Sequence, residues 1–230
     1  MAGREFKAIF FDLDGTLVDI HGPLYAAACN AIDLLGVKPR LTPERYRAAL
    51  SQGDIWLGVP EEMRRDYMQL AFAYFLAEID RTERLEVLPQ VSETLAELKR
   101  RNYVMGVVTS RPGSSQTLIE KLAMVGLAHY LDVVVTQTSP TLEALDKTQS
   151  LKQAALRAAV LPQACMYVGD EPRDTMAARN AGFGAMVAVA TGPASYNRLR
   201  DHEQFRPDAV MASMSELPGI IDRMRDGAGD

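Results

Sequence analysis

Residues 10–19 read FFDLDGTLVD, and this stretch is the most informative part of the chain because it combines a strand end with two acids. The apolar run through residues 7–11 predicts a strand that ends where Asp12 and Asp14 follow, two positions apart. In extended backbone, residues i and i+2 point to the same side, so both carboxylates face one spot. Asp and Gly are poor strand formers, so Gly15 marks the strand end, where we expect exposed main-chain N–H groups. Carboxylates together with free N–H groups favour phosphate chemistry.

The composition is that of a globular protein of 230 residues, with 47 % apolar and 24 % charged residues. This length accommodates one large domain, or a domain that carries a smaller insertion. The formal charge is −5 and no run is rich in Lys or Arg, so we expect no nucleic-acid partner.

We find no signal peptide and no apolar stretch of the roughly 20 residues that span a bilayer. A cytoplasmic protein without a membrane partner is the expectation. Cys29 and Cys165 match no metal-binding or redox spacing, so we expect two reduced thiols.

Short apolar runs recur along the chain and alternate with segments whose apolar residues lie three and four positions apart. After the first strand, the expected strands cover residues 104–108, 133–135, 166–168, 185–189 and 209–211. The expected amphipathic helices cover residues 91–101, 114–125, 148–159 and 175–181. This alternation predicts an α/β fold in which a doubly wound parallel sheet is covered by helices on both faces.

Residues 20–86 break the alternation, because they contain no good strand and are rich in Ala, Leu, Met, Tyr, Glu and Arg. We therefore predict a small all-helical cap domain over residues 20–86, and an α/β core over residues 1–19 and 87–230. The linkers around residues 18–20 and 86–89 are candidates for a hinge. The expected cap helices cover residues 23–35, 42–50 and 60–79.

Ligand sites in parallel sheets form outside the carboxyl ends of the strands, so the residues there are the candidates. Thr109 and Ser110 follow the second strand, and hydroxyls with loop N–H groups can hold phosphate oxygens. Arg111 comes next, but we leave it outside the predicted catalytic set. The fourth strand is followed by Asp170 and Asp174.

Four carboxylates in a small volume raise one another's pKa unless positive charge lies among them. Mg²⁺ fits this need, because it prefers oxygen ligands and bridges protein carboxylates to phosphate. A lysine should complete the neutralisation. Lys147, which opens an expected helix, is the favoured candidate, and Lys152 is the alternative.

In chain order, DLDGT, VVTS, a lysine before a helix and GDEPRD resemble the motifs of the haloacid dehalogenase superfamily, specifically its phosphatase branch with a helical cap after the first motif. LPQVSETLAELKRRNYVMGVVTSRP and YVGDEPRDTMAARNAG are similar to phosphoglycolate phosphatase-type members. The resemblance implies a Rossmann-like core, a Mg²⁺ cofactor and a phosphoric monoester hydrolase. It also implies a small phosphorylated metabolite as substrate.

The resemblance also implies the roles of individual residues. Asp12 would be the nucleophile that forms an aspartyl phosphate, and Asp14 the general acid and base. Thr109 and Lys147 would act on the transferring phosphoryl group, which Gly15 and Ser110 would help to bind.

The implied metal set uses four aspartates. Asp170 would bind Mg²⁺ together with the side chain of Asp12 and the main-chain carbonyl of Asp14. Asp174 would be a further ligand or a partner of one.

Two alternatives stay open. A phosphomutase of the β-phosphoglucomutase type keeps both acids but usually reads DGV where this chain has Gly15 and Thr16. A catalytically silent regulator that binds a phosphorylated metabolite is favoured only by the lysine loop, which reads TQTSPTLEALDK instead of the KPxP loop of many relatives.

The cap leaves three further questions open. Trp56 either shapes a leaving-group pocket or anchors cap packing. Phe72 and Phe75 are either core or interface residues, so both a monomer and a homodimer are compatible with the sequence. The leaving group itself is open among glycolate, sugars, nucleotides and phosphate, the last from pyrophosphate.

Overall fold

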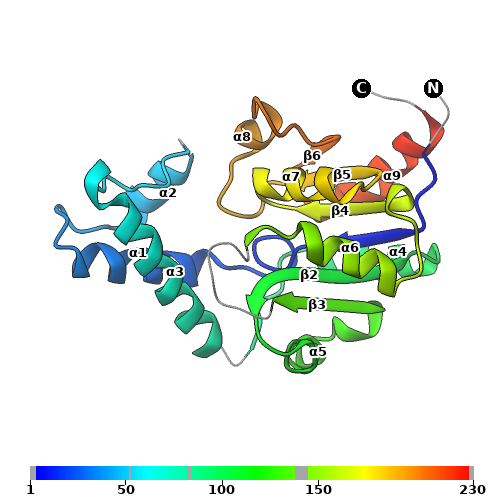
Figure 1. Cartoon of the computed structure of the whole chain (residues 1–230), viewed down its shortest axis with the longest axis horizontal. Coiled ribbons are helices and arrows are strands. Elements are labelled where there is room, and N and C mark those ends of the chain that lie inside the picture. Colours follow the sequence, from blue (N-terminus) through cyan, green and yellow to red (C-terminus); the bar gives the residue numbers. More distant parts are fainter. Residues whose placement is uncertain (1–3, 52, 82–83, 138–144, 228–230) are drawn as a thin grey trace.

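The computed structural model describes residues 4–51, 53–81, 84–137 and 145–227, which form a sheet-based core and a helical cap (Figure 1). The core sheet has six parallel strands in the order β3-β2-β1-β4-β5-β6. Its strands are β1 (Ala8–Phe11), β2 (Val104–Pro112), β3 (Val133–Gln137), β4 (Cys165–Gly169), β5 (Ala185–Val189) and β6 (Ala209–Met211).

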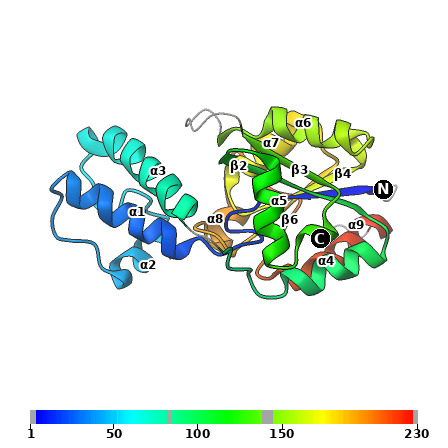
Figure 2. The ribbon, with the colours of Figure 1, turned by 90° about the horizontal axis from the view of Figure 1, so that it is seen from below.

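Helices cover both faces of the sheet, and Figure 2 shows α6 and α7 on one side with α4 and α9 on the other. Along β1, Ile9 and Phe11 pack toward one face, while Ala8 and Phe10 pack toward the opposite one. The helices of the first face are α4 (Val91–Arg100), α5 (Ser115–Met124) and α9 (Leu217–Asp226). Those of the second are α6 (Thr148–Arg157), α7 (Pro172–Ala181) and α8 (Tyr196–Arg200). The predicted doubly wound α/β fold is confirmed.

The segment expected to form the cap is helical and has its own apolar cluster. In this cluster Ala31 and Ile32 of the first helix lie with Tyr67 of the third. The third helix differs from its predicted range, because a 3₁₀ turn over Glu61–Met63 precedes it. The cap helices are α1 (His21–Leu34), α2 (Pro43–Ser51) and α3 (Arg64–Arg81).

The two linkers between core and cap lie side by side. Val18 forms an antiparallel bridge with Val87. The N–H of Asp19 donates to the carbonyl oxygen of Glu86 at 2.8 Å, and the chain therefore leaves and re-enters the core at one place. Hinge motion at this crossing stays a prediction.

Two element boundaries near the strand ends differ from the sequence expectation. Helix α7 begins at Pro172, three residues before the predicted start, because Glu171 and Asp174 form a reciprocal capping box. Strand β2 continues to Pro112, with an irregular register against β3 after Val108. Within the described ranges, none of the helices has the length and apolar character to cross a membrane, and both cysteines are free.

Candidate active site

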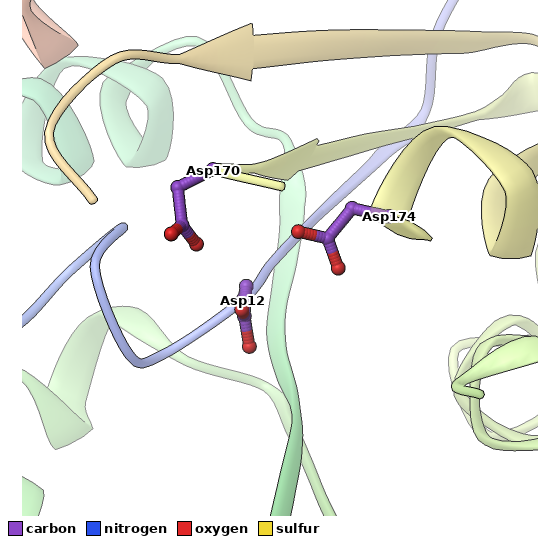
Figure 3. Close-up of side chains that lie close together, drawn as sticks. All are labelled: Asp12, Asp170 and Asp174. Atoms are coloured by element: carbon purple, nitrogen blue, oxygen red, sulfur yellow. The ribbon is translucent and has the colours of Figure 1, made fainter. Parts of the chain in front are cut away.

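Three aspartates meet at the carboxyl edge of the sheet. Asp12 follows β1, Asp170 follows β4, and Asp174 lies in the first turn of α7. Strands β1 and β4 are hydrogen-bonded neighbours in matched register, which brings their ends together. All three side chains are buried, their ligand oxygens lie within 4.8 Å of one another, and Figure 3 shows them converging on one small space.

Lys147 lies between two of these acids. Its Nζ is 2.7 Å from Oδ2 of Asp12 and 2.8 Å from Oδ1 of Asp174. The preceding Asp146 accepts a hydrogen bond from the N–H of Thr148 at 2.9 Å and so fixes the chain at the start of α6. The structure thus brings Lys147 to the acids and leaves the alternative, Lys152, exposed on α6.

Burial dominates the electrostatics of the acid cluster. It raises the pKa of Asp12 to about 7, although the ammonium of Lys147 works against this rise. Burial and the neighbouring Asp12 also raise the pKa of Asp170 well above its ordinary value. Burial lowers the pKa of Lys147, but the flanking carboxylates outweigh it and hold that pKa well above its ordinary range.

The cluster fits a divalent cation. Among the described residues, Lys147 pairs with Asp12 and Asp174, whereas Asp170, the third acid of the cluster, forms no ion pair. A Cβ on Gly192 would lie 1.8 Å from Oδ2 of Asp170, so only glycine backbone fits against this carboxylate. Hard oxygen donors with uncompensated negative charge match Mg²⁺.

Asp174 differs from the other two acids in how its oxygens are used. Oδ1 accepts from Lys147, and Oδ2 accepts from the N–H of Glu171 at 3.0 Å. In Asp170, by contrast, Oδ1 accepts from the hydroxyl of Thr16 at 3.1 Å, and within the described ranges Oδ2 has no hydrogen-bond partner. Asp174 therefore holds Lys147 in place, and its carboxylate is also one of the three that could hold a metal ion.

Asp14 lies outside the three-aspartate cluster, and Arg111 holds its carboxylate. Nε of Arg111 is 2.8 Å from Oδ2 of Asp14, and Nη2 is 2.6 Å from Oδ1. Burial lowers the pKa of Arg111, but Asp14 raises it above its ordinary value. The available signal for Arg111 was its position near the carboxyl end of β2, directly after Thr109 and Ser110, since all three line the same cavity.

The predicted phosphate-binding residues differ in their hydrogen bonds. Oγ1 of the buried Thr109 accepts from the N–H of Arg111 at 3.1 Å, which leaves its own hydrogen free to donate. Oγ of Ser110 is buried and, among the described residues, has no partner. This hydroxyl is therefore available to bond a phosphate oxygen at the strand end.

The sequence predicted exposed main-chain N–H groups at this strand end, but the N–H of Gly15 is not free. It donates to the carbonyl oxygen of Val18 at 2.9 Å. Gly15 supplies instead a turn at φ +78° and space beside Asp170, where a Cβ would lie 2.5 Å from Oδ2. Phosphate binding by Gly15 stays a prediction.

A cavity of about 290 Å³ opens from these residues toward the cap. Asp12, Asp14, Thr109, Ser110 and Lys147 line its core end. The open question about Trp56 is decided in favour of packing. Its ring contacts the cap cluster, and the guanidinium of Arg64 lies 4.9 Å from the ring centroid.

The family model of haloacid dehalogenase-like hydrolases matches residues 9–188 of the chain. The chain belongs to this family. The resemblance drawn from the motifs is therefore confirmed, and with it the expectation of a hydrolase.

Among the relatives of this haloacid dehalogenase-like hydrolase are two phosphoglycolate phosphatases. The protein from Vibrio parahaemolyticus is 31 % identical, and the match covers 96 % of this chain and 98 % of the relative. The protein from Synechococcus elongatus is 32 % identical, with 92 % and 95 % covered. A haloacid dehalogenase-like hydrolase structure from Streptococcus pneumoniae superposes with a TM-score of 0.68 at 22 % identity, covering 94 % and 98 % of the two chains.

We expect Lys147→Met to lower the free energy of unfolding of this hydrolase by about 3 kcal/mol at pH 8 without metal, because it leaves buried carboxylates unpaired. The loss should shrink at pH 5. A carboxyl whose folded pKa is raised, as that of Asp12 is to about 7, takes up a proton in the folded state there. Urea denaturation at both pH values measures the difference.

The matched control is Lys152→Met, which removes an exposed lysine one helical turn away. It should change the free energy of unfolding by less than about 0.5 kcal/mol. Equal losses in the two variants would contradict a buried charge role for Lys147.

Proposed function

We propose that this protein is a Mg²⁺-dependent phosphatase that hydrolyses small phosphomonoesters through an aspartyl phosphate on Asp12. The observation that supports the proposal is that the two aspartates of the first motif have different surroundings. Asp12 lies buried against Lys147 inside the acid cluster, whereas Asp14 lies outside it, held by Arg111 at the same cavity. One carboxylate is placed for attack on phosphorus and the other for proton transfer.

In the first step an oxygen of Asp12 forms a bond to phosphorus while the bond from phosphorus to the leaving oxygen breaks. Asp14 donates its proton to that oxygen. In the second step Asp14 takes a proton from water, whose oxygen attacks phosphorus and releases Asp12 and inorganic phosphate. The hydroxyls of Thr109 and Ser110 and the ammonium of Lys147 hold the phosphoryl oxygens.

Asp12 and Asp170 would hold Mg²⁺, which would supply positive charge to the phosphoryl oxygens. In its absence Lys147 is the cation closest to Asp12 among the described side chains. In this proposal the phosphate and the metal would be bound by neighbouring groups at one edge of the sheet.

The relatives support phosphatase activity over the two alternatives. Two of them are named phosphoglycolate phosphatases, and Asp14 and Thr16 keep the phosphatase form of the first motif. We therefore propose a small phosphorylated metabolite as the partner of this site.

The test is phosphate release from a panel of phosphomonoesters that includes p-nitrophenyl phosphate and glucose phosphates. We expect release with Mg²⁺, loss to background in EDTA, and recovery when Mg²⁺ is added in excess. A silent regulator predicts no release under any condition. A mutase predicts interconversion of hexose phosphates with little phosphate released.

Thermal denaturation of the same samples tests the metal independently of turnover. Mg²⁺ at 100 times its Kd should stabilise the fold by about 2.7 kcal/mol, and Asp170→Asn should remove most of this gain. The stabilisation should be weaker at pH 5.5 than at pH 8. Since burial raises the pKa of Asp12 to about 7, protons compete with the metal below that pH. An equal Mg²⁺ effect in Asp170→Asn would overturn the assigned metal site.

A further inference from the structure

The cavity that begins at the catalytic residues has a wall built from one face of α3. Met68, Ala71, Phe72 and Phe75 line it, and they recur at positions i, i+3, i+4 and i+7. Leu24 of α1 lines it as well. The two phenylalanines that the sequence left open between core and interface thus face the space above the nucleophile.

The cap contributes no charge to this cavity within the described residues. Every described cap residue that lines it is uncharged, and only Tyr46 and Tyr67 carry a polar group. Burial raises the pKa of both phenols, to about 12 for Tyr67, so both stay neutral. The charged lining residues come from the core alone.

Three of the four core cations that line this cavity are paired with acids, whereas the fourth, Arg198 of α8, lies beside Gly53 of the cap and forms no ion pair among the described residues. Lys147 lies against Asp12 and Asp174, Arg111 against Asp14, and Arg173 lies 2.7 Å from Glu171. A second carboxylate on the substrate, such as that of phosphoglycolate, would lose water against the apolar cap wall without gaining a cap cation. An apolar leaving group would instead gain from leaving water.

We infer that the substrate of this site is the phosphate monoester of an apolar alcohol or phenol, whose hydrocarbon body lies against the α3 wall while its phosphate meets Asp12. This inference rests on the proposed phosphatase function and narrows it. It sets the chain apart from its relatives named for phosphoglycolate, because the leaving group is selected by apolar contact.

The test is kcat/KM for ethyl, butyl and hexyl phosphate, with phosphoglycolate as the anionic comparison. The three alkoxide leaving groups have nearly equal basicity, so differences in kcat/KM among the three esters reflect contact with the cavity. We expect kcat/KM to rise about threefold to fourfold for each added methylene until the cavity is full, and phosphoglycolate to fall at least tenfold below hexyl phosphate.

A matched pair of variants on one helix locates the contact. Ala71 lines the cavity, whereas Ala73, two residues further along α3, is exposed. Ala71→Glu should lower kcat/KM for hexyl phosphate about 30-fold and abolish the dependence on chain length. Ala73→Glu should leave both unchanged. Phe72→Ser gives the same measurement if Ala71→Glu does not fold, as judged by circular dichroism.

The outcomes separate this inference from the function on which it rests. Hydrolysis of none of the esters would overturn the phosphatase proposal itself. Hydrolysis with no dependence on chain length, or with phosphoglycolate preferred, would overturn the apolar leaving group and leave the phosphatase proposal intact. A chain-length dependence that survives in Ala71→Glu and Phe72→Ser would contradict the α3 wall.

Discussion

Asp12→Asn should lower kcat for p-nitrophenyl phosphate by at least about 10⁴-fold, the scale of losses seen when a nucleophile is removed. The amide cannot form the acyl phosphate, and it removes one of the two carboxylates that face Lys147. The fold should survive, because burial already raises the pKa of Asp12 to about 7 and the neutral amide resembles the protonated carboxyl in size and charge.

Phosphate release and a thermal melt, measured on the same preparation, test this expectation. The control is Asp132→Asn, which also removes a carboxylate paired with a lysine, at 2.8 Å from Lys99, but on the surface far from the acid cluster. Its activity should match that of the unchanged protein. Substantial Mg²⁺-dependent turnover remaining in Asp12→Asn would contradict the covalent mechanism.

Asp14→Asn should lower kcat for an alkyl phosphate by about 10²-fold to 10⁴-fold, the usual range for loss of a general acid and base. The loss should be smaller in the first step for p-nitrophenyl phosphate, because p-nitrophenolate leaves without a proton. Comparing burst and steady-state rates for the two substrates measures this difference. Equal losses in the first step for both would contradict proton donation by Asp14.

Arg111 should act through Asp14, because the guanidinium of Arg111 donates hydrogen bonds to both carboxylate oxygens of Asp14. Arg111→Lys keeps the charge but loses the two-point contact, so we expect kcat for an alkyl phosphate to fall about tenfold. In the double variant with Asp14→Asn, the arginine change should add little. Fully additive losses would show that Arg111 acts independently of Asp14.

The fold was predictable because its signals are local. Six apolar runs that alternate with amphipathic segments predict a parallel sheet. Strand β1 places Ile9 and Phe10 on opposite faces, as expected of a strand. The start of α7 was missed, because the capping box between Glu171 and Asp174 competes with the apolar spacing that placed it at residue 175.

The sequence by itself determined the acids of the site, since strand ends in a parallel sheet meet at one edge and carry Asp12, Asp170 and Asp174 there. It did not determine their partners. The position at a helix start favoured Lys147 over Lys152 but left both open, and Arg111 lies 97 positions from Asp14. Only the folded chain brings these charges within 3 Å of the acids, because ion pairing depends on distances across the sheet that no local pattern encodes.

In the cap, too, some features follow from the sequence and others only from the folded structure. Its helices follow from composition and spacing, but which face of α3 looks into the cavity depends on how that helix packs against α1 and against the core. Only the folded structure shows that Met68, Phe72 and Phe75 line the cavity that Asp12 also lines, whereas Trp56 packs within the cap. The periodicity of a helix identifies its apolar face. What that face packs against depends on elements that are distant in the sequence.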